Sequence, residues 1–583
     1  MQNQSNPTRN WGIEQKKRPV RARGGMVAAK MPEAAEVGVS ILKAGGNAVD
    51  AAVATAFAIG VVEPYMNGIG GGGYMVIWLE KEKRSLIIDY PMISGSEAHE
   101  TMFPLADANT ESQALLFGWP ATVNNENVVG YTSIAVPGNV AGLSMALERY
   151  GTMSLAEVMQ PAIDLAENGY AVTWHTTLMQ ALFLGALKSF PETVKTQLGP
   201  GGVPMASYDQ SNPAIHTQKE LARSLRLIAE KGPREFYSGE LGKKIVADLR
   251  ANGSSITEND FSSYEAVEKD TVKVDYHGAV VHTIGGGTGG LSSSESLTML
   301  DQLDTSPPGQ RTAEDYHMMA QVFRQTFADR YAYLADDQAV HVPEAVLTDP
   351  EYARERIATF DRDVATQPVA GTKGRLGIEH DLDISVPEYL GARSSSTTHL
   401  SVVDAEGNAV SITQTLLNLY GSCVVIPETG VLMNNGLMWF DPEPGRPNSP
   451  GPRKRPLSNM APMVITRDDT LVASLGSSGG RKIQNCNVQV AINLIDSDMR
   501  AQEAIQEPQI ETSTTLLVVS PDIDTGVTQK LIEMGHNVAV RDNAAQTFDF
   551  ASPVAIRRLA DGSLDGGADP WYFPATVVGV EEE

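Results

Sequence analysis

The spacing of apolar and polar residues predicts helices and strands that follow one another along the whole chain. Apolar residues recur at helical spacing in residues 32–42 and again in the alanine-rich stretch 47–59. Pro32 suits the first position of a helix, where no backbone N–H is needed, and Asn47 suits the capping position of the second helix. A glycine loop at 68–73 then leads into apolar residues 74–79, which predict a strand.

Helical patterns dominate the middle of the chain, and strands return toward its end. We expect helices at residues 138–149, 155–168, 221–231 and 313–334. We expect strands within residues 272–284 and at 471–475, the latter followed by a glycine loop and a helix at 483–497. This alternation indicates an α/β fold in which helices lie outside packed β layers.

A run of small hydroxyl residues, SSSTT at 394–398, opens directly into a predicted β-hairpin. The first strand reaches residue 403, a turn follows at 404–408, and the second strand covers 409–413. Thr397 stands where the first strand begins. If the chain were cut before it, its hydroxyl would be a nucleophile and its freed α-amino group a base. An α-amino group has a pKa of about 7.7–8, so it accepts a proton near neutral pH.

Length and charge describe one acidic body. The 583 residues contain no linker rich in proline, glycine and serine and no internal repeat, so we expect a single layered unit. Lysine and arginine number 45 against 71 aspartate and glutamate residues, which gives a formal net charge of −26. Such a charge argues against nucleic acid or an anionic membrane surface as a partner.

The sequence predicts neither a metal, a cofactor nor a disulfide framework. Its two cysteines, Cys423 and Cys486, lie far apart outside any metal-binding motif, and the histidines lack the spacing of a zinc site. The first 25 residues are basic without an apolar core, so they do not read as a signal peptide. The longest apolar stretch, 51–62, is too short to span a bilayer. We therefore expect a cytoplasmic protein with no membrane partner.

The stretch that begins at Thr397 carries the most specific motif of the chain. Residues 397–435 read TTHLSVVDAEGNAVSITQTLLNLYGSCVVIPETGVLMNN. This resembles the γ-glutamyltransferase family, whose pattern is close to TTH-x-SVVD-x-x-GNAVS-x-T-x-TLN, followed by GILLNN. Other motifs similar to those of the family occur in order, namely GMVA at 25–28, GGNAVDAA at 45–52, GVVEP at 60–64, GIGGGG at 68–73, VPG at 136–138, KRPLS at 454–458 and GSSGG at 476–480.

The resemblance implies a fold and a maturation step. The fold is that of the N-terminal-nucleophile hydrolases, an α/β fold with four layers, αββα, and a mainly helical region in the large subunit. The maturation step is self-cleavage between Ser396 and Thr397. It gives a large chain of residues 1–396 and a small chain of residues 397–583, which together form a heterodimer.

The catalytic parts of the family pattern are present. The family has a supporting threonine at the position of Thr415 and an oxyanion-hole pair at the positions of Gly479 and Gly480. Backbone N–H groups of such a pair face the tetrahedral intermediate, and the absence of side chains permits close approach. Seen alone, each of these residues would be an unremarked turn or strand residue, so their interpretation depends on the shared register.

The residues that hold a γ-glutamyl group in the family are changed. The changes are Pro91 for an arginine, Leu417 for an asparagine, Gly436 for a glutamine, Trp439 for an aspartate, and Ser458-Asn459 for a serine pair. These family residues pair with an α-ammonium and an α-carboxylate, and a desolvated charge without a partner is expensive. Their loss disfavours a zwitterionic acyl group by several kcal/mol, roughly a thousandfold.

Retained catalysis with changed contacts predicts an amidohydrolase or acylase. Its substrate would be a small-molecule amide that lacks the α-amino group of a γ-glutamyl donor, such as a dicarboxylic monoamide or a bulkier side-chain amide. The basic turn at 453–455 offers cations for a carboxylate. The acyl acceptor is water or an amine, and the sequence leaves hydrolysis and transfer open. Two alternatives stay open, a true γ-glutamyltransferase or glutathione hydrolase, and an unprocessed noncatalytic homologue.

Overall fold

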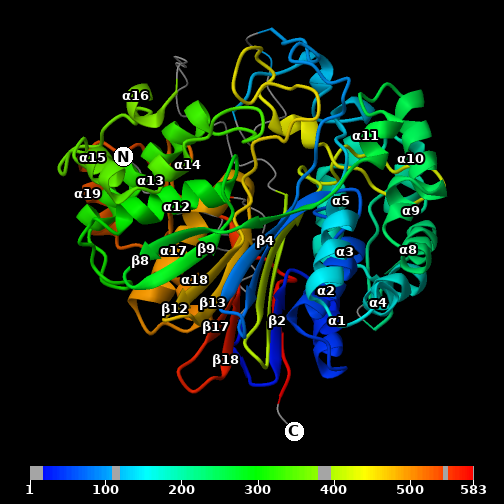
Figure 1. Cartoon of the computed structure of the whole chain (residues 1–583), viewed down its shortest axis with the longest axis horizontal. Coiled ribbons are helices and arrows are strands. Elements are labelled where there is room, and N and C mark those ends of the chain that lie inside the picture. The colour runs from blue at the N-terminus through cyan, green and yellow to red at the C-terminus, as the bar shows by residue number, and fades with distance from the viewer. Residues whose placement is uncertain are drawn as a thin grey trace.

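Two seven-stranded sheets lie face to face at the centre of the protein (Figure 1). This computed structural model describes residues 17–107, 110, 118–209, 211–378, 396–541 and 549–581. One sheet has the order β1 (Val20–Ala22), β18 (Leu564–Ala568), β17 (Ser552–Arg558), β13 (Thr470–Ser478), β12 (Met463–Arg467), β9 (Ala279–Thr283) and β8 (Val272–Tyr276). The other has the order β19 (Thr576–Gly579), β2 (Gly25–Ala29), β10 (Thr398–Asp404), β11 (Ala409–Thr415), β3 (Gly72–Leu79), β4 (Arg84–Tyr90) and β7 (Val267–Asp270).

Helices cover the outer face of each sheet and complete four layers (Figure 1). The β10 side carries α1 (Pro32–Lys43), α2 (Ala48–Val62), α3 (Asn139–Tyr150), α4 (Leu155–Asn168), α8 (Lys219–Lys231), α9 (Arg234–Tyr237), α10 (Glu240–Ala251) and α11 (Glu258–Ser262). The β13 side carries α12 (Gly289–Leu300), α13 (Ala313–Tyr333), α15 (Pro350–Ile357), α17 (Ile483–Asp496), α18 (Ala501–Gln506) and α19 (Thr525–Glu533). The predicted αββα fold is confirmed.

The remaining elements are short. The short helices are α5 (Trp174–Leu182), α6 (Leu184–Leu187), α7 (Pro191–Gln197), α14 (Glu344–Leu347) and α16 (Lys373–Leu376). Two small sheets contain β14 (Ile510–Glu511) with β15 (Leu517–Val519) and β16 (Val538–Val540), and β5 (Tyr170–Ala171) with β6 (Ile215–His216).

Helix α2 shows why the alanine-rich sequence forms this layer. The Asn47 side chain accepts hydrogen bonds from the backbone N–H groups of Val49 and Asp50, and Asp50 bonds back to the Asn47 amide, so a capping box starts the helix. All residues of α2 are buried between β10, β11 and the helices α1, α3 and α4. Small alanine side chains permit this close packing on every face, and the predicted helix at 47–59 extends three residues further, to Val62.

The predicted hairpin is also present. β10 and β11 pair antiparallel, and Asp404 closes the turn by accepting from the backbone and side-chain N–H groups of Asn408. β10 pairs on its other edge with β2, and β11 pairs with β3, so the hairpin lies in the middle of its sheet. In the described part of the chain, none of the helices combines the length and apolarity needed to cross a membrane.

Candidate active site

Thr397 lies at the open end of the β10–β11 hairpin and is buried. The register pairs Thr398 with Gln414, which brings Thr397 opposite Thr415 at the next position. Their hydroxyl oxygens are 3.5 Å apart, and Thr415 Oγ1 accepts a 2.8 Å hydrogen bond from the Leu417 amide. The structure thus places the two predicted threonines side by side, while their catalytic roles stay predictions.

The glycine loop before β3 forms one wall of this region. A Cβ on Gly71 would lie 2.3 Å from the Thr415 carbonyl oxygen, and one on Gly70 would lie 2.2 Å from the Leu432 carbonyl oxygen. No side chain fits at such distances. The side-chain Nδ2 of Asn434 also donates a 2.7 Å hydrogen bond to the Gly70 carbonyl. The loop therefore allows close backbone packing against Thr415 and Leu432.

His399, two residues beyond Thr397, lies between the two sheets. Its ring nitrogens bond to the hydroxyls of Thr413 at 2.8 Å and Ser401 at 3.1 Å. Burial, with a smaller effect from Lys30, holds the pKa of His399 well below its ordinary value, so the ring is neutral. A Cβ on Gly476 would lie 2.3 Å from this ring, which shows that β13 packs directly on β10 here.

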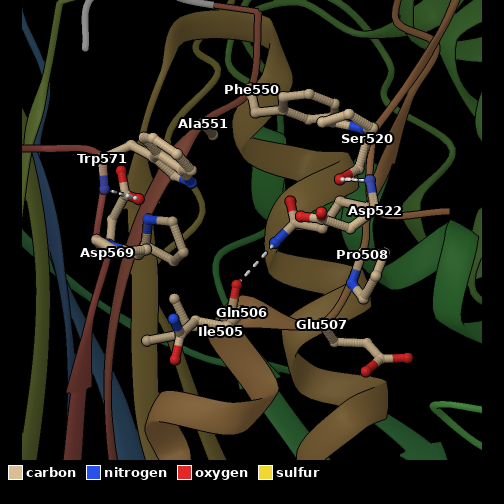
Figure 2. A pocket seen from close by; sticks show the side chains of 14 residues that line it. Ile505, Gln506, Glu507, Pro508, Ser520, Asp522, Phe550, Ala551, Asp569 and Trp571 are labelled. Carbon is tan, nitrogen blue, oxygen red and sulfur yellow. Dashed lines mark hydrogen bonds between the residues drawn. The ribbon is translucent and has the colours of Figure 1, made fainter. Parts of the chain in front are cut away.

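The predicted oxyanion-hole glycines follow this contact. β13 ends at Ser478, and Gly479 and Gly480 have φ angles of 156° and 61° before the chain turns toward α17. A Cβ on Gly479 would lie 2.5 Å from the Ala551 Cβ. Ala551 also lines a pocket between Trp571 and Phe550 (Figure 2). The glycine pair thus follows the strand that packs on His399, and its role as oxyanion hole stays a prediction.

A buried arginine, Arg330, forms hydrogen bonds to both Ser458 and Asn459. Arg330, in α13, donates to the Ser458 carbonyl at 2.6 Å and to Asn459 Oδ1 at 3.0 Å. It also donates to the Thr288 carbonyl and the Ser292 hydroxyl. Within the described ranges Arg330 has no acidic partner, and its Nε and the Asn459 Nδ2 make no hydrogen bond. Burial lowers the pKa of Arg330 to about 10, so it remains a cation at neutral pH.

The changed positions are packed with the protein's own groups. A Cβ on Gly436 would lie 2.7 Å from the Ala135 Cβ, so the site has no room for a glutamine there. Trp439 is buried, and its carbonyl accepts hydrogen bonds from the side chains of Asn448 at 2.7 Å and Trp119 at 3.4 Å. Leu417 has a φ of 91°, a region in which asparagine is more common than leucine.

Pro91 likewise takes part in a hydrogen bond within the protein. Its carbonyl accepts a 2.6 Å hydrogen bond from the Tyr264 hydroxyl. A proline side chain cannot form the ion pair that an arginine would. Together with Gly436 and Trp439, Pro91 leaves the five changed positions without a charged side chain.

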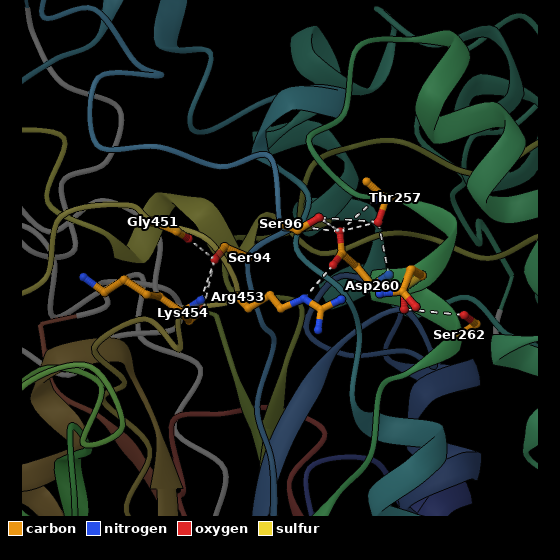
Figure 3. A network of polar contacts seen from close by, with 9 residues as sticks. Ser94, Ser96, Thr257, Asp260, Ser262, Gly451, Arg453 and Lys454 are labelled. Atoms are coloured by element: carbon orange, nitrogen blue, oxygen red, sulfur yellow. Dashed lines mark hydrogen bonds and ion pairs between the residues drawn. The ribbon is translucent and has the colours of Figure 1, made fainter.

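The basic turn at 453–455 is occupied by the protein itself. Arg453 Nε pairs with Asp260 at 2.9 Å (Figure 3). Lys454 Nζ donates to the backbone carbonyls of Pro447 and Ser449. Arg455 pairs with the buried Asp89 at 2.7 Å. These three cations fix the turn to its neighbours, so the sequence-based suggestion that they meet a substrate carboxylate gains no support from their contacts.

Two buried charged residues near this region were missed by the sequence analysis. Glu63 follows the apolar run that ends helix α2, and a charged residue at the end of an apolar run is the signal that points to it. Arg330 directly follows Asp329 in a helix that contains other charged residues, so nothing in the local sequence singles it out. No group of three or more metal-ligating side chains occurs in the residues that the structure describes.

The fold defines a class. Two facing sheets between helical layers are the arrangement of the N-terminal-nucleophile hydrolases. A cephalosporin acylase from Bacillus halodurans superposes with a TM-score of 0.81 at 26% identity, and the alignment covers 100% of both chains. The γ-glutamyltranspeptidase of Helicobacter pylori gives 0.54 at 30% identity over 60% of this chain and 96% of its own.

The chain belongs to the γ-glutamyltranspeptidase family, whose model matches residues 34–575. The Acylase ACY 1 proenzyme of Pseudomonas sp. strain SE83 is 35% identical over 566 residues, covering 97% of this chain and 95% of the relative. The glutathione hydrolase proenzyme of Escherichia coli K12 is 34% identical over 585 residues, covering 97% and 93%. The chain is therefore an acylase-like member of a family of hydrolases and acyltransferases that are made as proenzymes.

Proposed function

We propose that the protein is a self-processing acylase whose nucleophile is Thr397, and that its substrate is an amide with an anionic acyl group and no α-ammonium. The observation that carries this proposal is the contact of the Thr397 and Thr415 hydroxyls at 3.5 Å at the start of a buried central strand. The acylase proenzyme relative and the cephalosporin acylase fold support the reaction class.

The mature site would form an acyl-enzyme through Thr397. The α-amino group takes the hydroxyl proton as the oxygen attacks the amide carbonyl, and Thr415 orients that oxygen. The N–H groups of Gly479 and Gly480 would stabilise the tetrahedral oxyanion. The protonated α-amino group of Thr397 then gives its proton to the leaving amine of the substrate, and an ester on Thr397 remains. Water or a second amine attacks this ester and regenerates the free threonine.

The polar contacts around Ser458 support an anionic acyl group. Arg330 brings a buried positive charge to Ser458 and Asn459, and the described residues supply no acid to neutralise it. A buried charge that lacks a counter-ion is costly, so a substrate carboxylate that reduces this cost binds favourably. The Asn459 Nδ2, which bonds to none of the described residues, offers a donor at the same place. A dicarboxylic monoamide meets these requirements better than a neutral amide.

Glutathione hydrolysis is the second candidate, because several relatives that carry that name match this chain at about 34% identity. It requires a partner for the substrate α-ammonium. The position at which the family has an aspartate is occupied by the indole of Trp439. A carboxylate there would have provided the ion pair that an ammonium needs when it leaves water.

Two measurements test the proposal. Intact mass and N-terminal sequencing of purified protein should show a small chain that begins at Thr397, and Thr397→Ala should remain whole. The kcat/KM for glutaryl p-nitroanilide should then exceed that for γ-glutamyl p-nitroanilide by at least about tenfold, about 1.4 kcal/mol. An uncut wild-type chain would refute the nucleophile, and a preference for the γ-glutamyl anilide would refute the proposed acyl group.

A further inference from the structure

The short segment between α2 and the glycine loop, residues 63–66, contacts the chain on both sides of Thr397. The Met66 carbonyl accepts a 3.0 Å hydrogen bond from the Leu416 amide and a 3.5 Å bond from the Ser396 hydroxyl. The Tyr65 carbonyl accepts a 2.9 Å bond from the Tyr420 amide. One end of this segment therefore holds the residue before Thr397 and also the strand that carries Thr415.

Glu63, at the other end of the segment, lies against the residue after Thr397. It is fully buried, and its Oε1 accepts a 2.6 Å hydrogen bond from the Tyr572 hydroxyl. Among the residues that the structure describes, its Oε2 has no hydrogen-bond partner, and neither has the Thr398 hydroxyl. This hydroxyl is near enough to the carboxyl to lower its pKa. Two buried groups that can bond to each other thus meet at the first residue of β10.

Thr397 itself has a backbone conformation that needs such support. Its φ of 144° is outside the regions that residues with a branched Cβ adopt without strain. Backbone strain of this kind is of order 1–3 kcal/mol and persists only where the surrounding structure enforces it. The neighbouring residues Ser396 and Thr398 are in a position to enforce it. The Ser396 hydroxyl bonds to the Met66 carbonyl, and the Thr398 hydroxyl lies beside the Glu63 carboxyl, so both contact the segment 63–66.

We propose that Glu63 is a positioning residue for maturation. Together with Tyr572, Glu63 holds Thr398, while the Met66 carbonyl holds Ser396. These contacts on both sides keep Thr397 in the strained conformation from which the chain is cut. This inference rests on the proposed function, because it requires cleavage before Thr397. It goes beyond it by assigning a role to a residue of the large chain that takes no part in the acyl transfer.

The chemistry of maturation explains why positioning matters here. The Thr397 oxygen attacks the Ser396 carbonyl carbon, a C–O bond forms, the C–N bond breaks, and the hydroxyl proton ends on the Thr397 nitrogen. Water then cleaves the ester, which frees the Ser396 carboxylate and restores the hydroxyl. Before the cut the Thr397 nitrogen is an amide, which is not a base, so the precursor lacks the proton acceptor of the mature site. Release of strain and correct placement are what the folded precursor can supply.

The protonation state of Glu63 should therefore affect maturation. The groups that face it are Lys30, Tyr65, Tyr572 and Thr398, with Tyr170 further away. Burial raises the pKa of Glu63 to about 7, against the opposing effects of Thr398, Tyr572 and Lys30. The ionised carboxylate accepts from the Tyr572 hydroxyl and would accept from the nearby Thr398 hydroxyl with its second oxygen. Hydrogen bonds to a charged acceptor are shorter and stronger. Thr398, and with it the backbone at the proposed cleavage site, is therefore held best above pH 7.

The test is a maturation time course on freshly translated full-length chain between pH 5.5 and 8.5, followed on denaturing gels. The wild-type rate should rise about tenfold from pH 6 to pH 8, the rise in ionised carboxylate for a pKa of about 7. Glu63→Gln, which keeps the size and an acceptor for Tyr572, should remove this rise, and Tyr572→Phe should slow maturation at least threefold at pH 8. The matched control is Glu33→Gln, at a partly buried carboxyl whose pKa is also raised by burial, and it should follow the wild-type profile.

The outcomes separate this inference from the proposed function. If the wild type is cut before Thr397 and Thr397→Ala is not, the assignment of Thr397 as the nucleophile is supported. If Glu63→Gln then keeps the wild-type pH profile, the positioning role is wrong. If the wild type is not cut at this bond, the proposed function fails and the inference fails with it. Glu63→Asp provides a check on folding, because it should retain the pH dependence at a lower rate.

Discussion

Replacing Glu63 with glutamine should change how the stability of the protein depends on pH. The pKa of Glu63 is raised from its ordinary value of 4.5 to about 7 because the carboxyl is buried. Between these values the folded protein keeps a proton on Glu63 that the unfolded chain has released, so the free energy of unfolding falls as the pH rises through this window. Above pH 7 the loss is complete and amounts to about 3 kcal/mol.

The measurement is denaturant unfolding of the uncut chain, with Thr397→Ala as the common background. The quantity of interest is the difference in unfolding free energy between Glu63→Gln and the background chain at each pH. This difference should increase by about 3 kcal/mol from pH 4.5 to pH 8 in favour of glutamine. Any constant effect of the substitution on packing cancels, because only the change with pH is interpreted.

A flat difference across this pH range would refute the reasoning. It would mean that Glu63 has the same proton affinity in both states, which is incompatible with a carboxyl that is buried with one oxygen unbonded. A decrease with rising pH would mean that the charge of Lys30 outweighs burial. Asp441 offers a comparison, since burial raises its pKa only to about 6, and Asp441→Asn should show the same sign with a smaller amplitude.

Three further substitutions test the geometry of the site. Thr415→Val keeps the shape of the side chain but removes the hydroxyl 3.5 Å from Thr397 Oγ1, so kcat/KM should fall about tenfold or more, and equal activity would exclude a supporting role. Gly71→Ala places a Cβ 2.3 Å from the Thr415 carbonyl oxygen, so the melting temperature and the activity should both fall. Gly436→Gln restores the family residue where no space exists, so it should lower stability without raising activity on γ-glutamyl p-nitroanilide, which steady-state kinetics would show.

Local patterns were sufficient to predict the elements that form the site. The hairpin followed from alternating apolar residues on either side of a turn, and its register brought Thr397 opposite Thr415. Helix α2 followed from its capping asparagine and its alanine-rich sequence. These features depend on residues close together in the chain, where spacing in the sequence gives spacing in the structure.

The buried charges could not be found in this way, because their contacts are remote in sequence. Glu63 bonds to a tyrosine 509 residues away, and Arg330 to a carbonyl 128 residues away. The partners of the basic turn at 453–455 could not be predicted for the same reason, since nothing in the local sequence shows that Arg453 meets Asp260 or that Arg455 meets Asp89. A charged residue can be recognised from sequence, but its partner is set by the fold.

The topology also explains how a cut before Thr397 can leave the site intact. Strand β10 would become the N-terminal strand of the small chain, yet it stays paired with β2 of the large chain on one edge and with β11 on the other. β11 in turn pairs with β3, so the two small-chain strands of the hairpin lie between large-chain strands in the middle of this sheet. In the facing sheet, β12 pairs with β9 and β18 pairs with β1 in the same manner. β19 of the small chain pairs with the other edge of β2. Separating the chains would break these five strand pairings and expose both cores, so cleavage changes the connectivity at Thr397 without changing what surrounds it.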